Sequence, residues 1–263
     1  MHEVRTEYPL IPLRVLAQPN VAVPALLISI YGFGGTATSF VLPDYMTRIQ
    51  GPRALQIGDT LNWIALPPFV LVPLVVLLLK RIDARVLVVF GFSMIAIGSW
   101  LDTGLTHDWV SEDFIVSQLV EAVGLAFAIT ALITFAVANI TPVLAAAMAT
   151  TIQIARLLGN EIGGAVIQTF VRVREQVYSN LIGLHVIGGL PTTERTTAQL
   201  ADPFGRHAIG IGDPVAQGAG LLASYVRREA YVLAYIDAFW LIAWVSLLGI
   251  VLILLLRPPP PNP

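Results

Sequence analysis

Four ionisable residues lie inside stretches of the chain that are otherwise apolar: Glu121, Arg156, Glu161 and Asp237. If such stretches cross a membrane, a charge near the bilayer centre costs at least about 2.5 kcal/mol, so each one is a functional-site hypothesis. Glu121 and Arg156 lie well inside their stretches, whereas Glu161 and Asp237 can reach an interface. Two interpretations of Glu121 and Arg156 stay open. They form a polar cavity for substrate or a proton, or a structural ion pair that fixes helix packing.

Polar side chains accompany both of the deeper charges. At about 100° per residue of α-helix, Gln153, Arg156 and Asn160 fall on one face and form a polar stripe. Gln118 precedes Glu121 by about one helical turn and shares its face. Such a stripe and such an acid suit a polar cavity in an apolar helical bundle, where substrate or a proton would bind.

The composition places these residues in a membrane rather than in a soluble domain. Of the 263 residues, 56% are hydrophobic and only 12% are charged, which is about half the charged share of a soluble protein. So few charges cannot solvate the surface of a soluble enzyme. A net charge of −2 leaves no basic face for nucleic acid. We therefore expect the lipid bilayer as a partner, and no nucleic acid.

Metal, cofactor and enzyme chemistry are not expected. Cysteine is absent, which excludes disulfides, thiolate catalysis and cysteine-based metal sites. Every histidine falls outside the apolar stretches, at His2, His107, His185 and His207. A transported proton would therefore have to use carboxylates. The sequence contains neither an H-E-x-x-H motif nor a membrane-embedded Ser/His or paired-Asp arrangement, so an intramembrane enzyme is not predicted.

Six transmembrane helices account for the apolar stretches, since about 20 apolar residues span a bilayer core of about 30 Å. They are predicted over residues 21–43, 60–79, 82–105, 114–140, 142–171 and 231–256. Asn139, Thr141 and Pro142 separate the fourth helix from the fifth. A group of prolines is expected to kink the second helix at Pro67, Pro68 and Pro73. The sequence thus predicts an all-α integral membrane protein.

The distribution of positive charge predicts the orientation, because short inner loops carry most Lys and Arg. With the N-terminus inside, the basic residues of inner segments are Arg5, Arg14, Lys80, Arg81, Arg85 and Arg257, against Arg48 and Arg53 on short outer loops. We therefore expect a cytoplasmic N-terminal segment (1–20), a cytoplasmic tail (257–263) and a long external loop (172–230). Within that loop, residues 219–228 have the pattern of an amphipathic helix leading into the last span.

Small residues in the fifth predicted helix indicate close helix packing. Gly159 and Gly163 form a G-x-x-x-G spacing, which lets two membrane helices approach closely. Packing against a neighbouring helix is therefore the expected role of these two glycines.

Several motifs, taken in order, resemble the second half of a major facilitator superfamily transporter. The stretch PLIPLRVLAQPNVAV and the later FVLPDYMTRIQGPRALQIGD resemble the entry to that half. KRIDARVLVVFG resembles an inner loop of the fourteen-helix drug:proton antiporter branch, with Asp83, Arg85 and Gly91 at matching places. TTIQIARLLGNEIGGAVIQTF and REAYVLAYIDAFWLIAWVS resemble its last two helices.

This resemblance implies a proton-driven exporter of hydrophobic or cationic drugs that works by alternating access. The first, second, fourth and fifth helices would line the cavity, and the third and sixth would be peripheral. Cavity candidates are then Tyr31, Asn62, Trp63, Gln118, Glu121, Gln153, Arg156 and Asn160. Asp83 and Arg85 would belong to an inner-loop gating motif.

Members of this family have about twice as many helices, so the resemblance implies the C-terminal half of the fold. The chain would be a fragment, or a separate N-terminal half or a second copy would complete it, and alone it would not transport. The expected location is the inner cell membrane, with both termini cytoplasmic. One alternative stays open, a non-transporting interaction or regulatory protein that packs against another transporter.

Overall fold

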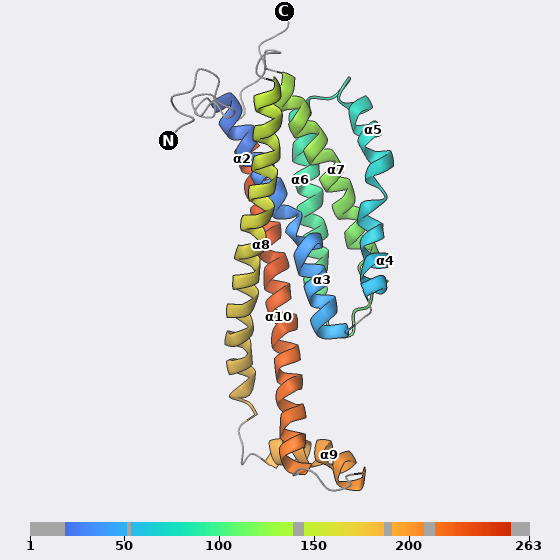
Figure 1. Cartoon of the computed structure of the whole chain (residues 1–263), viewed down its shortest axis with the longest axis vertical. Helices are drawn as coiled ribbons and strands as arrows, with labels where there is room; N and C mark the ends of the chain where they lie inside the picture. Colours follow the sequence, from blue (N-terminus) through green and yellow to red (C-terminus); the bar gives the residue numbers. More distant parts are fainter. Residues whose placement is uncertain (1–18, 52–53, 139–144, 187–190, 208–213, 254–263) are drawn as a thin grey trace, which may run out of the picture.

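Helices form the regular structure of the computed structural model, which describes residues 19–51, 54–138, 145–186, 191–207 and 214–253. No strand occurs within these ranges. Most helices run along the long axis of the molecule, whereas α9 lies across one end (Figure 1). The elements, with η marking short π-helical or 3-10 turns, are α2 (Pro19–Gly34), η2 (Ala37–Val41), α3 (Leu42–Tyr45), η3 (Met46–Gln50), α4 (Ala54–Ala65), α5 (Pro68–Leu78), α6 (Ala84–Leu101), η4 (Asp102–Gly104), α7 (Ile115–Ala138), α8 (Ala145–Gly183), α9 (Pro191–His207) and α10 (Pro214–Ile253). The predicted all-α fold is confirmed.

Five helical segments of the described ranges are long and apolar enough to cross a membrane, rather than the six predicted. They are Ala22–Gln50, Leu55–Leu78, Ala84–Gly104, Ile115–Val137 and Pro214–Ile253. The predicted span 142–171 falls in α8, which is 39 residues long but less apolar. Polar and charged residues such as Gln153, Arg156 and Glu161 lower its hydropathy. The apolar helices indicate a multi-pass membrane protein.

The first helical segment is longer than the predicted span 21–43. Beyond Gly34 the backbone continues through π-helical turns and the short helix α3 as far as Gln50. Pro43, which has no backbone N–H, lies in the first turn of α3, where a missing donor does little harm. Gly51 ends the segment in the left-handed conformation, with φ of 59°. The charged residues Asp44 and Arg48 thus belong to the helix rather than to a loop.

The second predicted span, 60–79, is two helices in the structure. α4 ends at Ala65 and α5 begins at Pro68, with a break at Leu66 and Pro67. Two consecutive prolines remove two backbone donors, and Pro68 suits the first turn of a new helix. The expected kink therefore lies at Pro67 and Pro68, while Pro73 stays inside α5.

The pair α6 and α7 forms a close antiparallel seam at the centre of the bundle (Figure 1). Glycine makes this approach possible, because a Cβ atom on Gly124 would lie 2.6 Å from the backbone nitrogen of Ile95. A Cβ atom on Gly91 would likewise lie 2.5 Å from the backbone nitrogen of Ala128. Both distances are far below van der Waals contact, so these positions exclude any side chain.

The predicted loop over residues 172–230 is mostly helical, which corrects the expected boundaries. α8 continues to Gly183, α9 occupies Pro191–His207, and the last helix begins at Pro214 instead of residue 231. The loop prediction was wrong because the charged residues there mark a loss of hydropathy, and charge by itself does not end a helix. In Figure 1, α8 and α10 lie side by side and project well beyond the other helices, with α9 at their tip. Residues 219–228, predicted as an amphipathic helix, lie inside α10.

Some predicted features lie outside the described residues. These are the N-terminal segment as far as residue 18, the break at Asn139, Thr141 and Pro142, and the tail 257–263.

Candidate functional site

Small side chains bring α2 and α8 into backbone contact, and this contact positions the predicted polar stripe. A Cβ atom on Gly159 would collide with the carbonyl oxygen of Ser29, and one on Gly163 would lie 2.7 Å from Thr36 Cγ2. The Ser29 hydroxyl donates to the Ala155 carbonyl of α8 at 3.0 Å. The two glycines of the G-x-x-x-G spacing therefore lie against α2, as the spacing predicts.

The polar stripe of α8 lies beside this contact and is open rather than buried. Arg156 donates from Nε to Oε1 of Gln153 at 3.1 Å, and both side chains are exposed. Asn160 is half-buried and accepts a hydrogen bond from the Ser39 hydroxyl at 3.3 Å. Since exposed charge is costly in lipid, the stripe marks a face that suits a polar cavity or another polypeptide.

Glu121 and Gln118, by contrast, are buried inside the bundle. Glu121 is 0% exposed and Gln118 is 1% exposed. No ion pair of the described residues joins Glu121 to Arg156, and a cavity shared by the two residues stays a prediction. Tyr31 of α2 lies within electrostatic range of both Arg156 and Glu121. The predicted cavity residues are thus divided into an open set on α8 and a buried set on α7.

The remaining predicted cavity residues lie on α4. Asn62 and Trp63 are exposed, Trp63 by 45%. α4 packs against α7, and no interaction between the described residues joins Asn62 or Trp63 to the α8 stripe. A role for Asn62 and Trp63 in a cavity stays a prediction.

Asp83 and Arg85, predicted as a gating motif, lie at the start of α6. The Asp83 side chain accepts a hydrogen bond from the Arg85 backbone N–H at 2.8 Å, so Asp83 is the N-cap of α6. The Arg85 guanidinium lies over the Phe135 ring, 6.0 Å from its centroid. This geometry gives both residues a structural task at the α6–α7 seam, and gating stays a prediction.

The structure adds residues that the sequence analysis missed. Asp102 follows α6 directly and is 0% exposed, as is Ser99 one turn earlier. Asp102 acts electrostatically on Glu121, and the Thr38 side chain of the π-helical turn η2 lies beside Glu121. The i, i+3 spacing of Ser99 and Asp102 on one face of the predicted helix 82–105 was the available signal. It was overlooked because Asp102 also begins an acidic run typical of an external loop.

An ion-pair network joins α8 and α10. Arg174 of α8 pairs with Asp237 of α10, and the Tyr178 hydroxyl donates to Asp237 Oδ2 at 2.8 Å. Burial, and then the hydrogen bond to Asp237, raise the pKa of Tyr178 above its ordinary value. Arg227 of α10 pairs with Glu175 of α8 at 3.5 Å. Asp237 thus has two structural partners, Arg174 and Tyr178.

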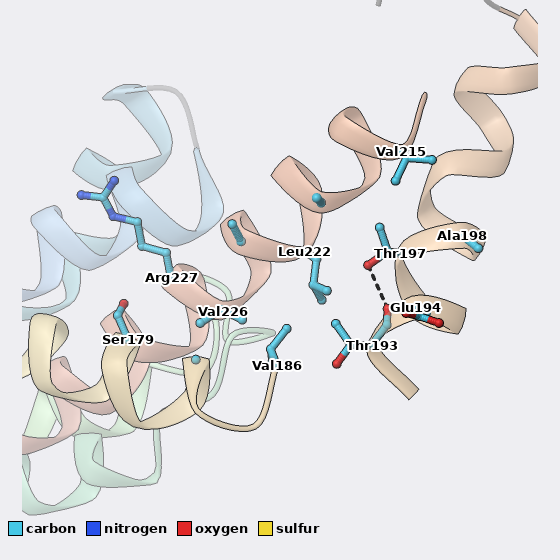
Figure 2. Close-up of a pocket in the computed structure, with 13 residues that line it drawn as sticks. Ser179, Val186, Thr193, Glu194, Thr197, Ala198, Val215, Leu222, Val226 and Arg227 are labelled. Atoms are coloured by element: carbon cyan, nitrogen blue, oxygen red, sulfur yellow. Dashed lines mark hydrogen bonds between the residues drawn. The ribbon is translucent and has the colours of Figure 1, made fainter. Parts of the chain in front are cut away.

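A cavity of about 750 Å³ lies between the end of α8, α9 and the start of α10 (Figure 2). Its lining includes Val186, Leu222 and Val226, and Thr193 and Thr197 stand on the α9 side. The volume falls in the range of small-molecule sites. None of the predicted site residues lines this cavity.

The sequence of the chain is similar to those of a multidrug export protein, an MFS-type transporter and a fatty acid resistance protein. It is 22% identical to the multidrug export protein EmrB of Escherichia coli (strain K12) over 260 residues, covering 98% of this chain and 49% of that protein. It is 27% identical to the MFS-type transporter Rv1250 of Mycobacterium tuberculosis over 249 residues, covering 94% of this chain and 39% of that protein. It is 22% identical to the fatty acid resistance protein FarB of Neisseria gonorrhoeae over 257 residues, covering 98% of this chain and 49% of that protein.

This likeness supports a transport role. No family model matches the chain. The chain spans about half the length of the curated relatives, or less.

Proposed function

We propose that this chain is the C-terminal half of a proton-coupled transporter of the major facilitator superfamily. It would export hydrophobic or cationic compounds by alternating access, together with an N-terminal half or a second copy. Two observations from the sequence comparison support this proposal. The likeness to a multidrug export protein extends over 98% of the chain, and the chain spans 49% of that protein.

The open polar stripe of α8 is the observation that carries the proposal. Arg156 and Gln153 are exposed in a bundle whose outer surface is otherwise largely apolar, with Phe69 79% and Val70 74% exposed on α5. An arginine facing lipid would be strongly unfavourable, whereas one facing a watery cavity between two halves would be solvated. Arg156 would therefore face the substrate pathway, with Tyr31 beside it.

Glu121 is the proposed proton-carrying acid. It is completely buried on α7, and no ion pair of the described residues neutralises it. A carboxyl group buried in this way is stable only when it holds a proton or another cation. Tyr31 would link Glu121 to the Arg156 side of the cavity, because it lies within electrostatic range of both.

The test uses cells that make the protein natively, so that any natural partner is present. A deletion strain and strains with Arg156→Ala or Glu121→Gln are expected to accumulate ethidium to the same raised level. Arg172→Ala is the matched control, since Arg172 is an exposed arginine of α8 beyond the predicted span 142–171. That control strain should export ethidium normally, with equal amounts of all variants in the membrane by immunoblot.

The same strains distinguish the alternative function, a non-transporting partner of another transporter. The projecting α8–α9–α10 hairpin, with its cavity, supports this alternative because it offers a surface outside the bundle. In that case deletion would raise ethidium accumulation, but Arg156→Ala and Glu121→Gln would not. Normal export in the deletion strain would contradict the transporter proposal for this compound class.

A further inference from the structure

Unpartnered oxygen atoms gather where α6 ends and α7 begins. The buried side-chain atoms without a hydrogen-bond partner include both carboxylate oxygens of Asp102 and Glu121, Oε1 of Gln118, and the hydroxyls of Ser99 and Thr38. Buried polar atoms nearly always have a partner, and each one without a partner costs about 1–3 kcal/mol. So many unpartnered acceptors in one place indicate a ligand that interacts with oxygen.

The helix geometry brings these five residues to one place, which we call the oxygen cluster. A Cβ atom on Gly98 would lie 3.2 Å from Glu121 Cβ, so α6 and α7 touch at this level. Asp102 follows Gly98 by one turn on α6, and Gln118 precedes Glu121 by one turn on α7. Thr38 joins from the π-helical turn η2, a kind of distortion that is frequent at functional sites.

No basic side chain of the described residues forms an ion pair with the carboxylates of the oxygen cluster. The Ser117 hydroxyl, which lies beside Asp102, donates to the Phe114 carbonyl at 3.0 Å instead. Among the described residues, Asp102 and Tyr31 are the titratable groups that act on Glu121. Arg156 of α8 acts on Tyr31 and forms no ion pair with either acid in that part of the chain. In the part of the chain that the structure describes, two carboxyl groups thus share one buried region, and no basic side chain pairs with them.

We propose that the oxygen cluster binds a monovalent metal cation of the alkali class, such as sodium. Carboxylate, amide carbonyl and hydroxyl oxygens are the ligands of hard cations, and the cluster offers no nitrogen or sulfur ligand. The described residues contain no group of three or more His, Asp or Glu side chains that could hold a metal ion, which disfavours a divalent cation. With one sodium ion bound, one of the two carboxyl groups would keep a proton and the site would be neutral.

This proposal deepens the proposed function and rests on it in one respect, since it takes Glu121 as the coupling acid. The cation and a second proton would compete for the same two carboxyl groups. Binding of sodium should therefore weaken as the pH falls. Binding can be measured on the purified chain without substrate, without a second half and without transport, so that the two proposals can fail separately.

The test measures thermal unfolding of the purified full chain by tryptophan fluorescence, in NaCl or choline chloride at equal ionic strength. A ligand of the folded state raises the midpoint, here by on the order of 3 °C at saturating sodium. Asp102→Asn and Glu121→Gln should abolish this rise. Glu161→Gln, which neutralises an exposed acid of α8, is the matched control and should keep it.

Equilibrium binding of radioactive sodium provides a second readout for variants that unfold easily. Ser99→Ala, the mildest change in the oxygen cluster, should lower the affinity for sodium about tenfold and leave the chain folded. The proposal is overturned if sodium and choline give the same midpoint, or if the midpoint responds to pH alone. A rise in the midpoint with calcium but not with sodium would overturn the monovalent assignment. If the Asp102→Asn/Glu121→Gln double variant still binds sodium, the ion binds elsewhere in the chain and the proposed site is wrong.

Discussion

The α6–α7 seam and the α8–α10 seam differ in whether their acidic side chains have partners. At the α6–α7 seam the helices touch through glycine, and Asp102 and Glu121 are left without partners. At the α8–α10 seam Asp237 and Glu175 each pair with an arginine of the other helix. A fully paired polar network stabilises the contact between two helices. Buried carboxyl groups without partners destabilise the fold unless a ligand or a proton binds to them.

This contrast separates structural charges from functional ones better than membrane depth does. Asp237 lies in an apolar helix, as Glu121 does, yet its carboxylate accepts hydrogen bonds from Arg174 and Tyr178. The informative property is therefore the missing partner, and it identifies the α6–α7 seam as the place where chemistry would occur.

Enlarging a glycine of the α6–α7 seam should cause the largest loss of stability, because the two helices could no longer touch. In Gly124→Val the added Cβ would lie 2.6 Å from the Ile95 backbone nitrogen, and backbone cannot move aside as a flexible side chain can. We expect a loss of about 3 kcal/mol or more, seen as little monodisperse protein after detergent extraction. Gly164→Ala is the control, because nothing lies within 4 Å of its added Cβ. Equal yields of the two variants would mean that the seam is looser than described.

Replacing Glu121 by an apolar residue should raise the stability of the chain. Glu121→Leu removes a buried, unpartnered carboxyl group, so in sodium-free buffer the chain should gain about 2 kcal/mol of stability. The measurement is the unfolding midpoint, compared with Ile95→Val, a core change of the same seam that should destabilise by about 1 kcal/mol. A lowered midpoint for Glu121→Leu would show that the carboxyl group is satisfied after all.

Hydropathy was sufficient to predict most of the fold. The helices of the first, third and fourth spans appear near residues 21–43, 82–105 and 114–140, because apolar length determines where a chain can cross lipid. The hairpin of α8, α9 and α10 was missed for the same reason. Outside lipid a helix needs no apolar composition, and Arg174, Glu175 and Arg227 stabilise it by pairing across the seam.

The candidate site was predicted only in part. The stripe of Gln153, Arg156 and Asn160 follows from helical periodicity, because that pattern lies within one helix. The grouping of Glu121 with Arg156 in one cavity stays a prediction, since the packing of α7 against α6 and of α8 against α2 cannot be deduced from local spacing. The burial of Asp102 could not be predicted without knowing the helix packing either, because a neighbouring helix covers it.

Breaking the satisfied seam should cost less than crowding the glycine seam. Asp237→Asn removes the partner of Arg174, but Arg174 is 38% exposed at its side chain and water can replace the lost bond. We therefore expect a loss of about 1 kcal/mol, measured as a lowered unfolding midpoint. The double variant Arg174→Met/Asp237→Asn should be no worse than Asp237→Asn alone, since the pair acts as a unit. Additive losses would show that the two residues do not depend on each other.

The smallest effect is expected at the far end of α6, and it isolates the oxygen cluster from general stability. Asp83→Ala removes the side-chain cap on the Arg85 N–H, which should cost about 0.5–1 kcal/mol. Asp83→Ser, which can still cap, is the control. Because Asp83 lies at the opposite end of α6 from Asp102, the sodium-dependent rise in the midpoint should be the same in Asp83→Ala as in the wild type. A sodium effect that shrinks with any loss of stability in α6 would mean that the salt acts on the whole helix pair, and the contrast between the two seams would then lose its functional meaning.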